Sequence, residues 1–214
     1  MGYCKFLCLY LIVPLLVACS EDEVVYDIGE YKVDLATVQM DNDRQSFLLD
    51  NYALLLNGGN VRNLEAGQRV LLNYSYLTEK QTGYDYVVKV NGVGFITQGK
   101  LLEVDSITID TIANKPVYME SVWIGSNYLN LSFYMNYNSQ RHSITLLTDK
   151  NKTGDDEISV FFRHNDNNDS PGYMHKVIVS FDLSTVLGLP TKNRKLILNI
   201  NSDNYGQKDY QLTY

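Results

Sequence analysis

The sequence predicts an all-β protein with two small domains. Its composition is one reason, because 17 Tyr and 7 Phe accompany many Val and Ile residues, and these side chains favour strands. Alternation is a second reason: in Tyr128–Tyr137, every second residue is apolar or aromatic, as in a half-buried antiparallel strand. A third is that short apolar runs are separated by turn signals such as Asn57-Gly58-Gly59-Asn60. This spacing is typical of sandwiches and barrels.

The first half of the chain predicts a hairpin between the strands Arg69–Leu77 and Tyr84–Asn91. The connection between them is polar and contains Gly83. Asn91-Gly92 and Gly94 then indicate a turn or a bulge. The other strands expected in this half are Tyr31–Val38, Phe47–Leu49, Ala53–Leu56 and Ser106–Ile109.

The second half is expected to hold further strands and one short helical turn within Asp182–Leu189, which Pro190 would end. Asn114-Lys115-Pro116 breaks the strand pattern, so we expect a first domain over 31–113 and a second over 114–214. A single large β domain is the alternative. The expected strands are Val117–Ile124, Tyr128–Tyr137, His142–Thr148, Ile158–His164, Lys176–Phe181, Leu196–Asn201 and Tyr210–Tyr214.

An apolar run of 13 residues, Phe6–Ala18, follows Lys5 and precedes Cys19. A membrane-spanning helix takes about 20 residues, so the run is too short to be one. It resembles the signal peptide and lipobox of bacterial lipoproteins. The resemblance implies that residues 1–18 are cleaved, that Cys19 carries a diacylglycerol thioether, and that residues 19–30 form an acylated tether. Cleavage without lipidation is the alternative.

Lipidation of Cys19 would place the protein in the cell envelope, anchored to the outer membrane. The run Ser20-Glu21-Asp22-Glu23 resembles the acidic surface-export signal of Bacteroidetes lipoproteins. A solvated tether on a protein that faces the periplasm is the other interpretation of these residues.

The cysteine count and the charge exclude several classes of function. Cys4 and Cys8 would leave with the signal segment and Cys19 would carry lipid, so no thiol would remain for a disulfide, a zinc site or a nucleophile. The net charge is −7, and loss of Lys5 with the signal makes the mature chain more acidic. Such a chain is a poor partner for nucleic acid.

Several segments resemble the NigD-like lipoproteins of Bacteroidetes. Residues 67–74 and Val90-Asn91-Gly92 are similar to the first domain of that family. Residues 123–131, His142-Ser143-Ile144 and Phe162-Arg163-His164 are similar to the second. The resemblance implies an OB-like small barrel followed by an antiparallel β-sandwich. A bacteriocin immunity role has been suggested for the family, and most of its members have no established activity.

The sequence lacks complete motifs for catalysis, metal binding or cofactor binding. The three histidines, His142, His164 and His175, lack the close spacing of a metal site. The loop Asn165–Ser170 departs from the EF-hand pattern, and Gly92-Val93-Gly94 lacks the rest of a dinucleotide fingerprint. No G-x-S-x-G elbow is present. We therefore expect no enzyme activity, no cofactor and no metal, with a hydrolase that brings two distant carboxylates together as the alternative.

Four tyrosines of the predicted hairpin are candidate ligand-binding residues. Tyr74, Tyr76, Tyr84 and Tyr86 could share one face, and OB folds use a strand face and its loops to bind oligosaccharides. Burial in a barrel core is the competing interpretation, and Trp123 has the same two alternatives of core residue and stacking platform.

Two short sequences concern modification. Asp105-Ser106-Ile107 and Asp110-Thr111-Ile112 resemble the O-glycosylation sites of exported Bacteroidetes proteins. Ser106 and Thr111 are therefore candidate glycosylation sites, with Thr111 favoured.

These observations together predict a non-enzymatic, lipid-anchored envelope protein that acts as a binding module. The expected partners are the membrane, through Cys19, and another envelope protein or a glycan, with no nucleic acid. Bacteriocin immunity and glycan binding at the cell surface are the two alternatives for its role.

Overall fold

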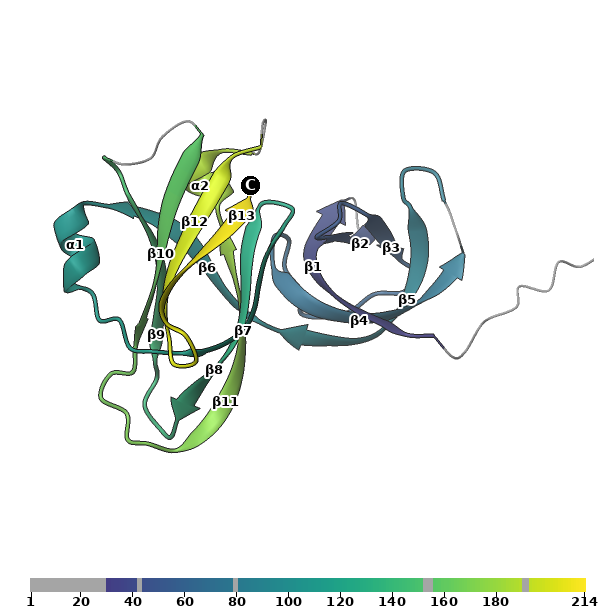
Figure 1. The fold of residues 1–214 in the computed structure, drawn as a ribbon. Helices are drawn as coiled ribbons and strands as arrows, with labels where there is room; N and C mark the ends of the chain where they lie inside the picture. The colour runs from purple at the N-terminus through teal and green to yellow at the C-terminus, as the bar shows by residue number, and fades with distance from the viewer. Residues whose placement is uncertain (1–29, 42–43, 79–80, 152–155, 190–192) are drawn as a thin grey trace, which may run out of the picture.

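The protein is all-β, as the sequence predicts, in a computed structural model that describes residues 30–41, 44–78, 81–151, 156–189 and 193–214. Five strands form a closed barrel, and eight form one sheet that curls into a sandwich beside it (Figure 1). Cys19 and the predicted signal segment lie outside the described residues. Neither helix in the described ranges has the length and apolar composition of a membrane span.

The barrel closes because its first strand pairs on both sides. β1 pairs antiparallel with β2 and with β4, while β3 and β5 pair in parallel. Side chains that alternate along β4, Val70, Leu72 and Tyr74, meet Phe47 and Leu55 in the barrel core. The barrel strands are β1 (Lys32–Asp41), β2 (Arg44–Leu49), β3 (Leu54–Asn57), β4 (Arg69–Thr78) and β5 (Tyr86–Phe95).

The predicted hairpin is present as β4 and β5, and it carries the expected bulge. Asn73 pairs with Gly92 but Tyr74 pairs with Val90, so Asn91 is the extra residue. The Asn91 amide Nδ2 bridges the bulge by donating to Ser75 Oγ at 3.0 Å. The bulge confirms what the Asn-Gly pair predicted.

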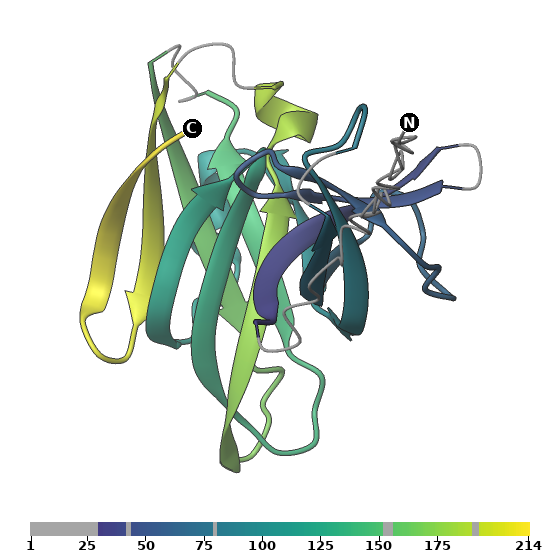
Figure 2. The same cartoon turned by 90° about the vertical axis from the view of Figure 1, so that its right-hand side faces the viewer.

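The sandwich is one continuous sheet in the order β13-β12-β10-β9-β6-β11-β8-β7. Figure 2 shows the β12–β13 hairpin at one edge of it. The two layers meet at rings such as Phe133 and Phe162, whose centroids are 5.4 Å apart. The short helix α2 (Ser184–Leu187) lies where the sequence predicts it. The strands are β6 (Thr97–Val104), β7 (Tyr118–Gly125), β8 (Tyr128–Tyr137), β9 (Ser143–Asp149), β10 (Glu157–Asn165), β11 (Tyr173–Asp182), β12 (Lys195–Ser202) and β13 (Gly206–Thr213).

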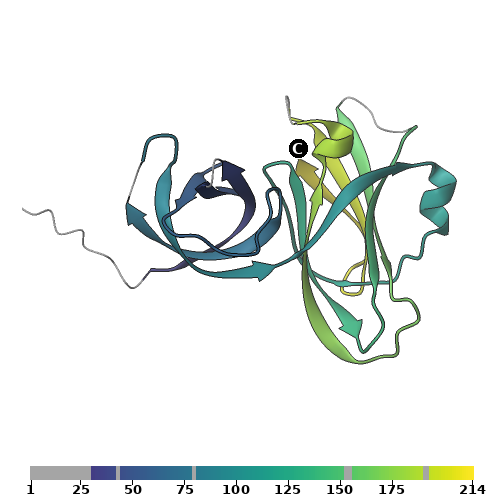
Figure 3. The same ribbon diagram turned by 180° about the vertical axis from the view of Figure 1, so that it is seen from behind.

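β6 was not expected, and it moves the junction between the two domains. It pairs in parallel with both β11 and β9, so it belongs to the sandwich. Figure 3 shows β6 leaving the barrel and crossing to the sandwich. The barrel therefore gives way to the sandwich between Phe95 and Thr97, earlier than the predicted division at 113/114.

The strand predicted at Ser106–Ile109 is wrong, because this segment forms the helix α1 (Ser106–Thr111). Asp105 explains the difference: its Oδ1 accepts a hydrogen bond from the Thr108 amide at 2.8 Å and so caps the first turn. The alternation of β-branched residues resembles a strand, but the cap decides the local structure.

A buried ion pair joins the barrel to the sandwich. Arg69 on β4 is 1% exposed, and its Nη2 donates to Asp50 Oδ1 at 2.7 Å and to Asn130 Oδ1 on β8 at 3.2 Å. The guanidinium carbon also lies 4.3 Å from the centroid of the Tyr128 ring. These partners hold a charge that is removed from water, and an unpaired charge at such a position is strongly destabilising.

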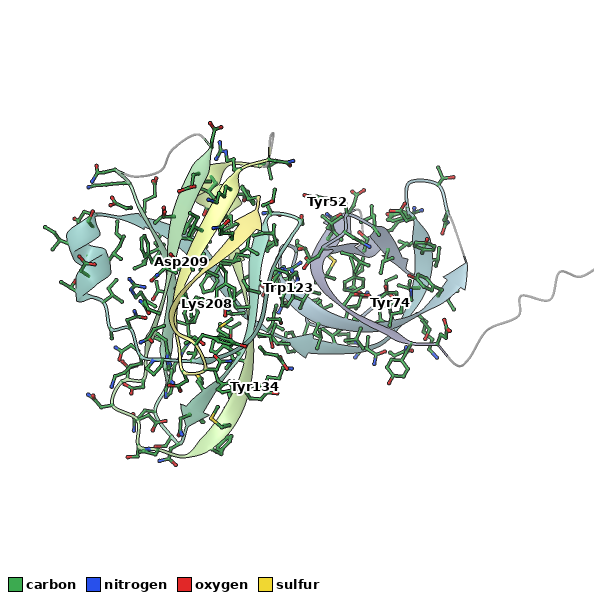
Figure 4. The ribbon with its side chains drawn as sticks, viewed as in Figure 1. Tyr52, Tyr74, Trp123, Tyr134, Lys208 and Asp209 are labelled. Atoms are coloured by element: carbon green, nitrogen blue, oxygen red, sulfur yellow. The ribbon has the colours of Figure 1, made fainter. Side chains whose placement is uncertain are left out.

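Asp50 completes this junction from the β2–β3 turn. Its Oδ2 accepts from Asn130 Nδ2 at 2.9 Å and from Trp123 Nε1 at 3.3 Å. Figure 4 shows Trp123 on the side of the sandwich that faces the barrel. Its backbone carbonyl accepts the Ser126 amide at 2.9 Å. Gly125 permits this approach, because a Cβ there would lie 2.2 Å from the Asp50 carboxylate. Trp123 is therefore a junction residue.

Replacing Asp50 with Ala should lower the free energy of unfolding by about 3–5 kcal/mol, because Arg69 would stay buried without its carboxylate. Urea unfolding followed by circular dichroism measures the loss. The matched control is Glu157→Gln, which removes an exposed pair with Lys195 (3.1 Å) and should cost less than about 1 kcal/mol. Equal losses for the two variants would contradict this assignment.

Candidate functional site

An open pocket of about 580 Å³, here named the tyrosine pocket, lies on the barrel. β1, β4, the β2–β3 turn and the start of β5 contribute to it. Its volume is in the range of small-molecule sites. The lining residues are Lys32, Asp34, Leu49, Asn51, Tyr52, Ala53, Tyr74, Tyr76, Asp85 and Tyr86.

Three of the four predicted tyrosines meet in this pocket. The rings of Tyr74 and Tyr76 pack edge to face with centroids 5.5 Å apart, and Tyr76 and Tyr86 are 4.7 Å apart. Tyr74 is buried, whereas Tyr76 is 38% exposed and Tyr86 is half-buried. Tyr74 is therefore part of the barrel core, and Tyr76 is the ring of the cluster most accessible to a ligand.

Tyr84 does not line the pocket, so the sequence-based grouping of four tyrosines is wrong for this residue. β5 begins at Tyr86, and Tyr84 lies in the preceding turn, where its amide donates to the Gln81 carbonyl at 2.9 Å. The predicted alternation continued the strand two residues too far, because Gly83 allows the chain to turn there with φ of 83°.

The pocket combines hydrogen-bond donors and acceptors. The Tyr74 hydroxyl donates to Asp34 Oδ2 at 3.0 Å. Burial raises the pKa of Tyr74, as do its hydrogen bonds with Tyr76 and Asp34, so this hydroxyl stays protonated. Asp85 Oδ2 accepts the Leu54 amide at 2.8 Å. Lys32 Nζ lies 5.2 Å from the centroid of the Tyr76 ring, so one cation accompanies the two carboxylates.

Tyr52 lies at the rim of the tyrosine pocket in an unusual backbone conformation. Its φ is 68°, its side chain is 60% exposed, and its amide donates to the Leu49 carbonyl at 3.0 Å. The left-handed conformation costs a residue other than glycine about 1–2 kcal/mol. Strain of this kind collects at functional sites, and here it holds an aromatic ring beside the pocket.

A second cluster, which the sequence did not predict, brings two histidines together at one end of the sandwich. His142 Nδ1 lies 2.9 Å from His164 Nε2, and His142 Nε2 lies 3.3 Å from Asp169 Oδ2. The pairing of β9 with β10 brings these residues together although they are 22 positions apart. His175 lies on β11, and its ring is 5.6 Å from that of Tyr137.

The electrostatics of this cluster favour a structural role. Burial lowers the pKa of His164, and the neighbouring His142 lowers it further, so His164 is neutral at pH 7. His142 Nε2 carries the hydrogen in the contact with the Asp169 carboxylate, and the contact between His142 Nδ1 and His164 Nε2 occupies the other nitrogen of the His142 ring. The two ring nitrogens thus bond each other and do not converge on one point. Among the described residues, no three His, Cys, Asp or Glu side chains are grouped to hold a metal ion.

The two candidate glycosylation residues differ in accessibility. The Ser106 hydroxyl donates to an Asp149 carboxylate oxygen, and the residue is half-buried. Thr111 is exposed at the end of α1, where its hydroxyl donates to the Thr108 carbonyl at 3.0 Å. Accessibility therefore favours Thr111, as the sequence analysis did.

Two family models match the chain in the order of its domains. The NigD-like N-terminal OB domain matches residues 35–96, and the NigD-like C-terminal beta sandwich domain matches residues 100–214. The chain belongs to the NigD-like family. Both matched ranges agree with the barrel and the sandwich, including the assignment of β6 to the second domain.

Solved structures share the fold of this NigD-like protein. A protein of unknown function from Bacteroides vulgatus ATCC 8482 is 24% identical, with a TM-score of 0.73 over 86% of this chain and 91% of that one. A NigD-like immunity protein from Bacteroides caccae ATCC 43185 is 18% identical, with a TM-score of 0.61 over 84% and 91%. A protein from Bacteroides fragilis NCTC 9343, provisionally named a lipoprotein, is 11% identical, with a TM-score of 0.64 over 86% and 98%. No curated protein matches the sequence.

The Asp169 carboxylate is expected to contribute to the free energy of unfolding in a way that depends on pH. Burial alone would raise its pKa, but hydrogen bonds from the amides of Asn138, Gln140 and Ser139 and from His142 lower it to about 2. An unfolded Asp has a pKa of about 4, so the contribution is complete above pH 4 and is lost as the pH falls toward 2.

The Asp169→Asn variant should therefore be less stable than the wild type at pH 7, and the gap should close between about pH 4 and pH 2. Urea midpoints measured across this range test the expectation. Asp203→Asn, at an exposed position of the β12–β13 turn, is the control and should show no such convergence. A gap for Asp169→Asn that stays constant down to pH 2 would show that the carboxylate is not held as described.

Proposed function

We propose that this NigD-like protein is a non-enzymatic binding protein of the cell envelope, and that its tyrosine pocket binds a neutral carbohydrate. The observation that carries the proposal is the combination of open tyrosine rings with side chains that donate and accept hydrogen bonds. Flat rings pack against the apolar faces of sugars, while the polar groups bind hydroxyls. OB folds bind oligosaccharides through a strand face and its loops.

The charge of the pocket supports a neutral ligand. Lys32 is accompanied by Asp34 and Asp85, so the lining has both signs and a small negative excess. Two carboxylates repel phosphate and other strong anions, and the chain as a whole has a net charge of −7. Nucleic acid is disfavoured on both counts.

The hydrogen bonds of the two carboxylates support binding in preference to hydrolysis. Asp34 accepts from the Tyr74 hydroxyl, and Asp85 accepts from the Leu54 amide, so a protein donor holds each of them. Glycoside hydrolysis needs one carboxyl as acid and another as base or nucleophile on either side of the scissile bond. The alternative of a hydrolase predicts that a bound oligosaccharide is cleaved.

The lipobox supports a lipid anchor at Cys19, with the outer membrane as the site of attachment. The name given to the Bacteroides fragilis relative points the same way. The acidic run Glu21–Glu23 supports display at the surface. Thr111, which is exposed, is the preferred site of glycosylation. In this arrangement the barrel follows the tether directly, so the tyrosine pocket lies in the domain nearer the membrane anchor.

Replacing Tyr52 with Gly should abolish carbohydrate binding and leave the free energy of unfolding within about 1 kcal/mol of the wild type, because Gly adopts φ of 68° without strain. Binding is measured on an array of neutral and uronic-acid oligosaccharides and then by calorimetric titration. Tyr205→Ala, at an exposed tyrosine of the β12–β13 turn, is the control and should bind as the wild type does.

Three results would contradict the carbohydrate proposal. The first is that no oligosaccharide on the array binds, and the second is that Tyr52→Gly binds normally. The third is the release of new reducing ends from a bound oligosaccharide, which would make the protein a hydrolase.

Replacing Cys19 with Ala should move the protein from the membrane fraction to the soluble fraction, because a cysteine is needed at this position for the thioether lipid. Fractionation of cells followed by immunoblotting measures the change. Cys8→Ala, within the predicted signal segment, is the matched control and should stay in the membrane fraction. Full retention of Cys19→Ala in membranes would overturn the anchor.

Bacteriocin immunity is the second candidate, and the name of the Bacteroides caccae relative is what favours it. Deleting the gene and exposing the cells to the cognate toxin tests this role. Immunity predicts increased sensitivity, and unchanged sensitivity would remove the candidate.

A further inference from the structure

β6 fills only part of the space between its two neighbours. Thr97–Lys100 pair with Val179–Asp182 of β11. Leu101–Val104 then pair with Leu146–Asp149 of β9. Among the described residues, no strand pairs with Tyr173–Ile178 of β11 on the side away from β8. The sheet therefore has an internal gap beside Tyr173–Ile178, because β6 begins only opposite Val179.

This part of β11 is an open strand edge. Tyr173, Met174, His175 and Lys176 are all exposed, and their pairing with β8 uses one edge of the strand. In such a strand, alternate residues direct an N–H and a C=O away from the paired neighbour. Open edges recruit further strands, and proteins use this property for peptide recognition.

A groove of about 1060 Å³, here named the edge groove, lies along this edge. His175–Ile178 of β11 form one part of its lining and Arg141–Ile144 another. Gly94 and Phe95 of the barrel contribute at the domain junction. Phe95 is 68% exposed, so the groove offers an apolar anchor point beside the free edge.

The charge of the edge groove is opposite to that of the protein. Its lining includes Arg141 and Lys176 together with two histidines, and among the described residues none of the side chains that line it is acidic. The whole chain carries a net charge of −7. Lys176 is paired with Glu120 at 2.7 Å, whereas Arg141 is exposed and has no ion pair within the described residues. Arg141 is thus available to an acidic ligand.

We propose that the edge groove binds an extended acidic peptide segment of a partner protein, which adds to β11 as a further strand. The main-chain groups of β11 would bond the peptide backbone, Arg141 would pair with a carboxylate, and Phe95 would contact an apolar side chain. A second copy of the chain fits less well, because it would bring like charges at Arg141 and Lys176 together. This site is separate from the tyrosine pocket, and the proposal does not depend on carbohydrate binding.

The probes are three series of synthetic eight-residue peptides. In each series Val or Thr occupies every second position, and the positions between are Glu in the first series, Lys in the second and Ser in the third. The Glu series should bind, and hydrogen exchange should show that amides within 173–178 become protected. Backbone N-methylation of the peptide should abolish binding, because it removes the donors that a strand needs. Tyr52→Gly, designed against the tyrosine pocket, should leave peptide binding unchanged.

Arg141→Glu should weaken binding of the Glu peptide about tenfold or more. Arg62→Glu is the matched control, since Arg62 is an exposed arginine of the barrel that does not line the groove, and it should bind as the wild type does. The proposal is overturned if no peptide binds, if the Lys series binds as well as the Glu series, or if the N-methylated peptide still binds. Self-association that protects the same amides without peptide would assign the edge to a second copy instead.

Discussion

The buried pair of Arg69 and Asp50 sets the position of the barrel on the sandwich, and the edge groove, which residues of both domains line, depends on that position. Asp50 belongs to the same turn as Tyr52, so the contacts that hold its carboxylate also hold the rim of the tyrosine pocket. Phe95 lies where the chain leaves the barrel and contributes to the edge groove. A shift of the barrel would therefore alter the edge groove, whereas a change in the turn that holds Asp50 would alter the rim of the tyrosine pocket.

The pair is best understood as a determinant of orientation. Burying two charges costs several kcal/mol, which their attraction and hydrogen bonds only partly offset, so an apolar junction of the same shape could be as stable. The junction is specific because its side chains are linked to one another: Asn130 bonds Arg69 and Asp50, and the Ser180 hydroxyl donates to Asn130 Oδ1 at 2.6 Å. A polar network of this kind has few alternative arrangements, whereas apolar surfaces can slide.

The sequence predicts the faces of strands better than their partners. The range expected for Tyr128–Tyr137 is that of β8, because alternation and β propensity agree there. Arg69 was expected only as part of a strand, since nothing local indicates that a charged residue will meet Asp50 and Asn130 in a buried junction. The contact between His142 and His164 likewise depends on which strands pair.

Sequence patterns also gave the wrong local structure where two of them pointed to different conformations. At Ser106–Ile109, the β-branched alternation predicted a strand, but the Asp105 cap selects a helix. At Tyr84, Gly83 turns the chain, so three of the four predicted tyrosines line the pocket, and Tyr52 of the β2–β3 turn is the fourth tyrosine there. The tyrosine pocket could thus be predicted in part, from residues that neighbour each other along one hairpin. The edge groove could not be predicted, because it depends on strand pairing: β6 pairs with β11 only from Val179 onward and leaves the preceding residues of β11 without a neighbour on that side.

Calorimetric unfolding of the purified protein tests the central role of the junction most directly. If Arg69 and Asp50 bind the barrel and the sandwich into one cooperative unit, the protein should unfold in a single transition whose calorimetric and van't Hoff enthalpies agree. Two separate transitions, one for each domain, would contradict this account.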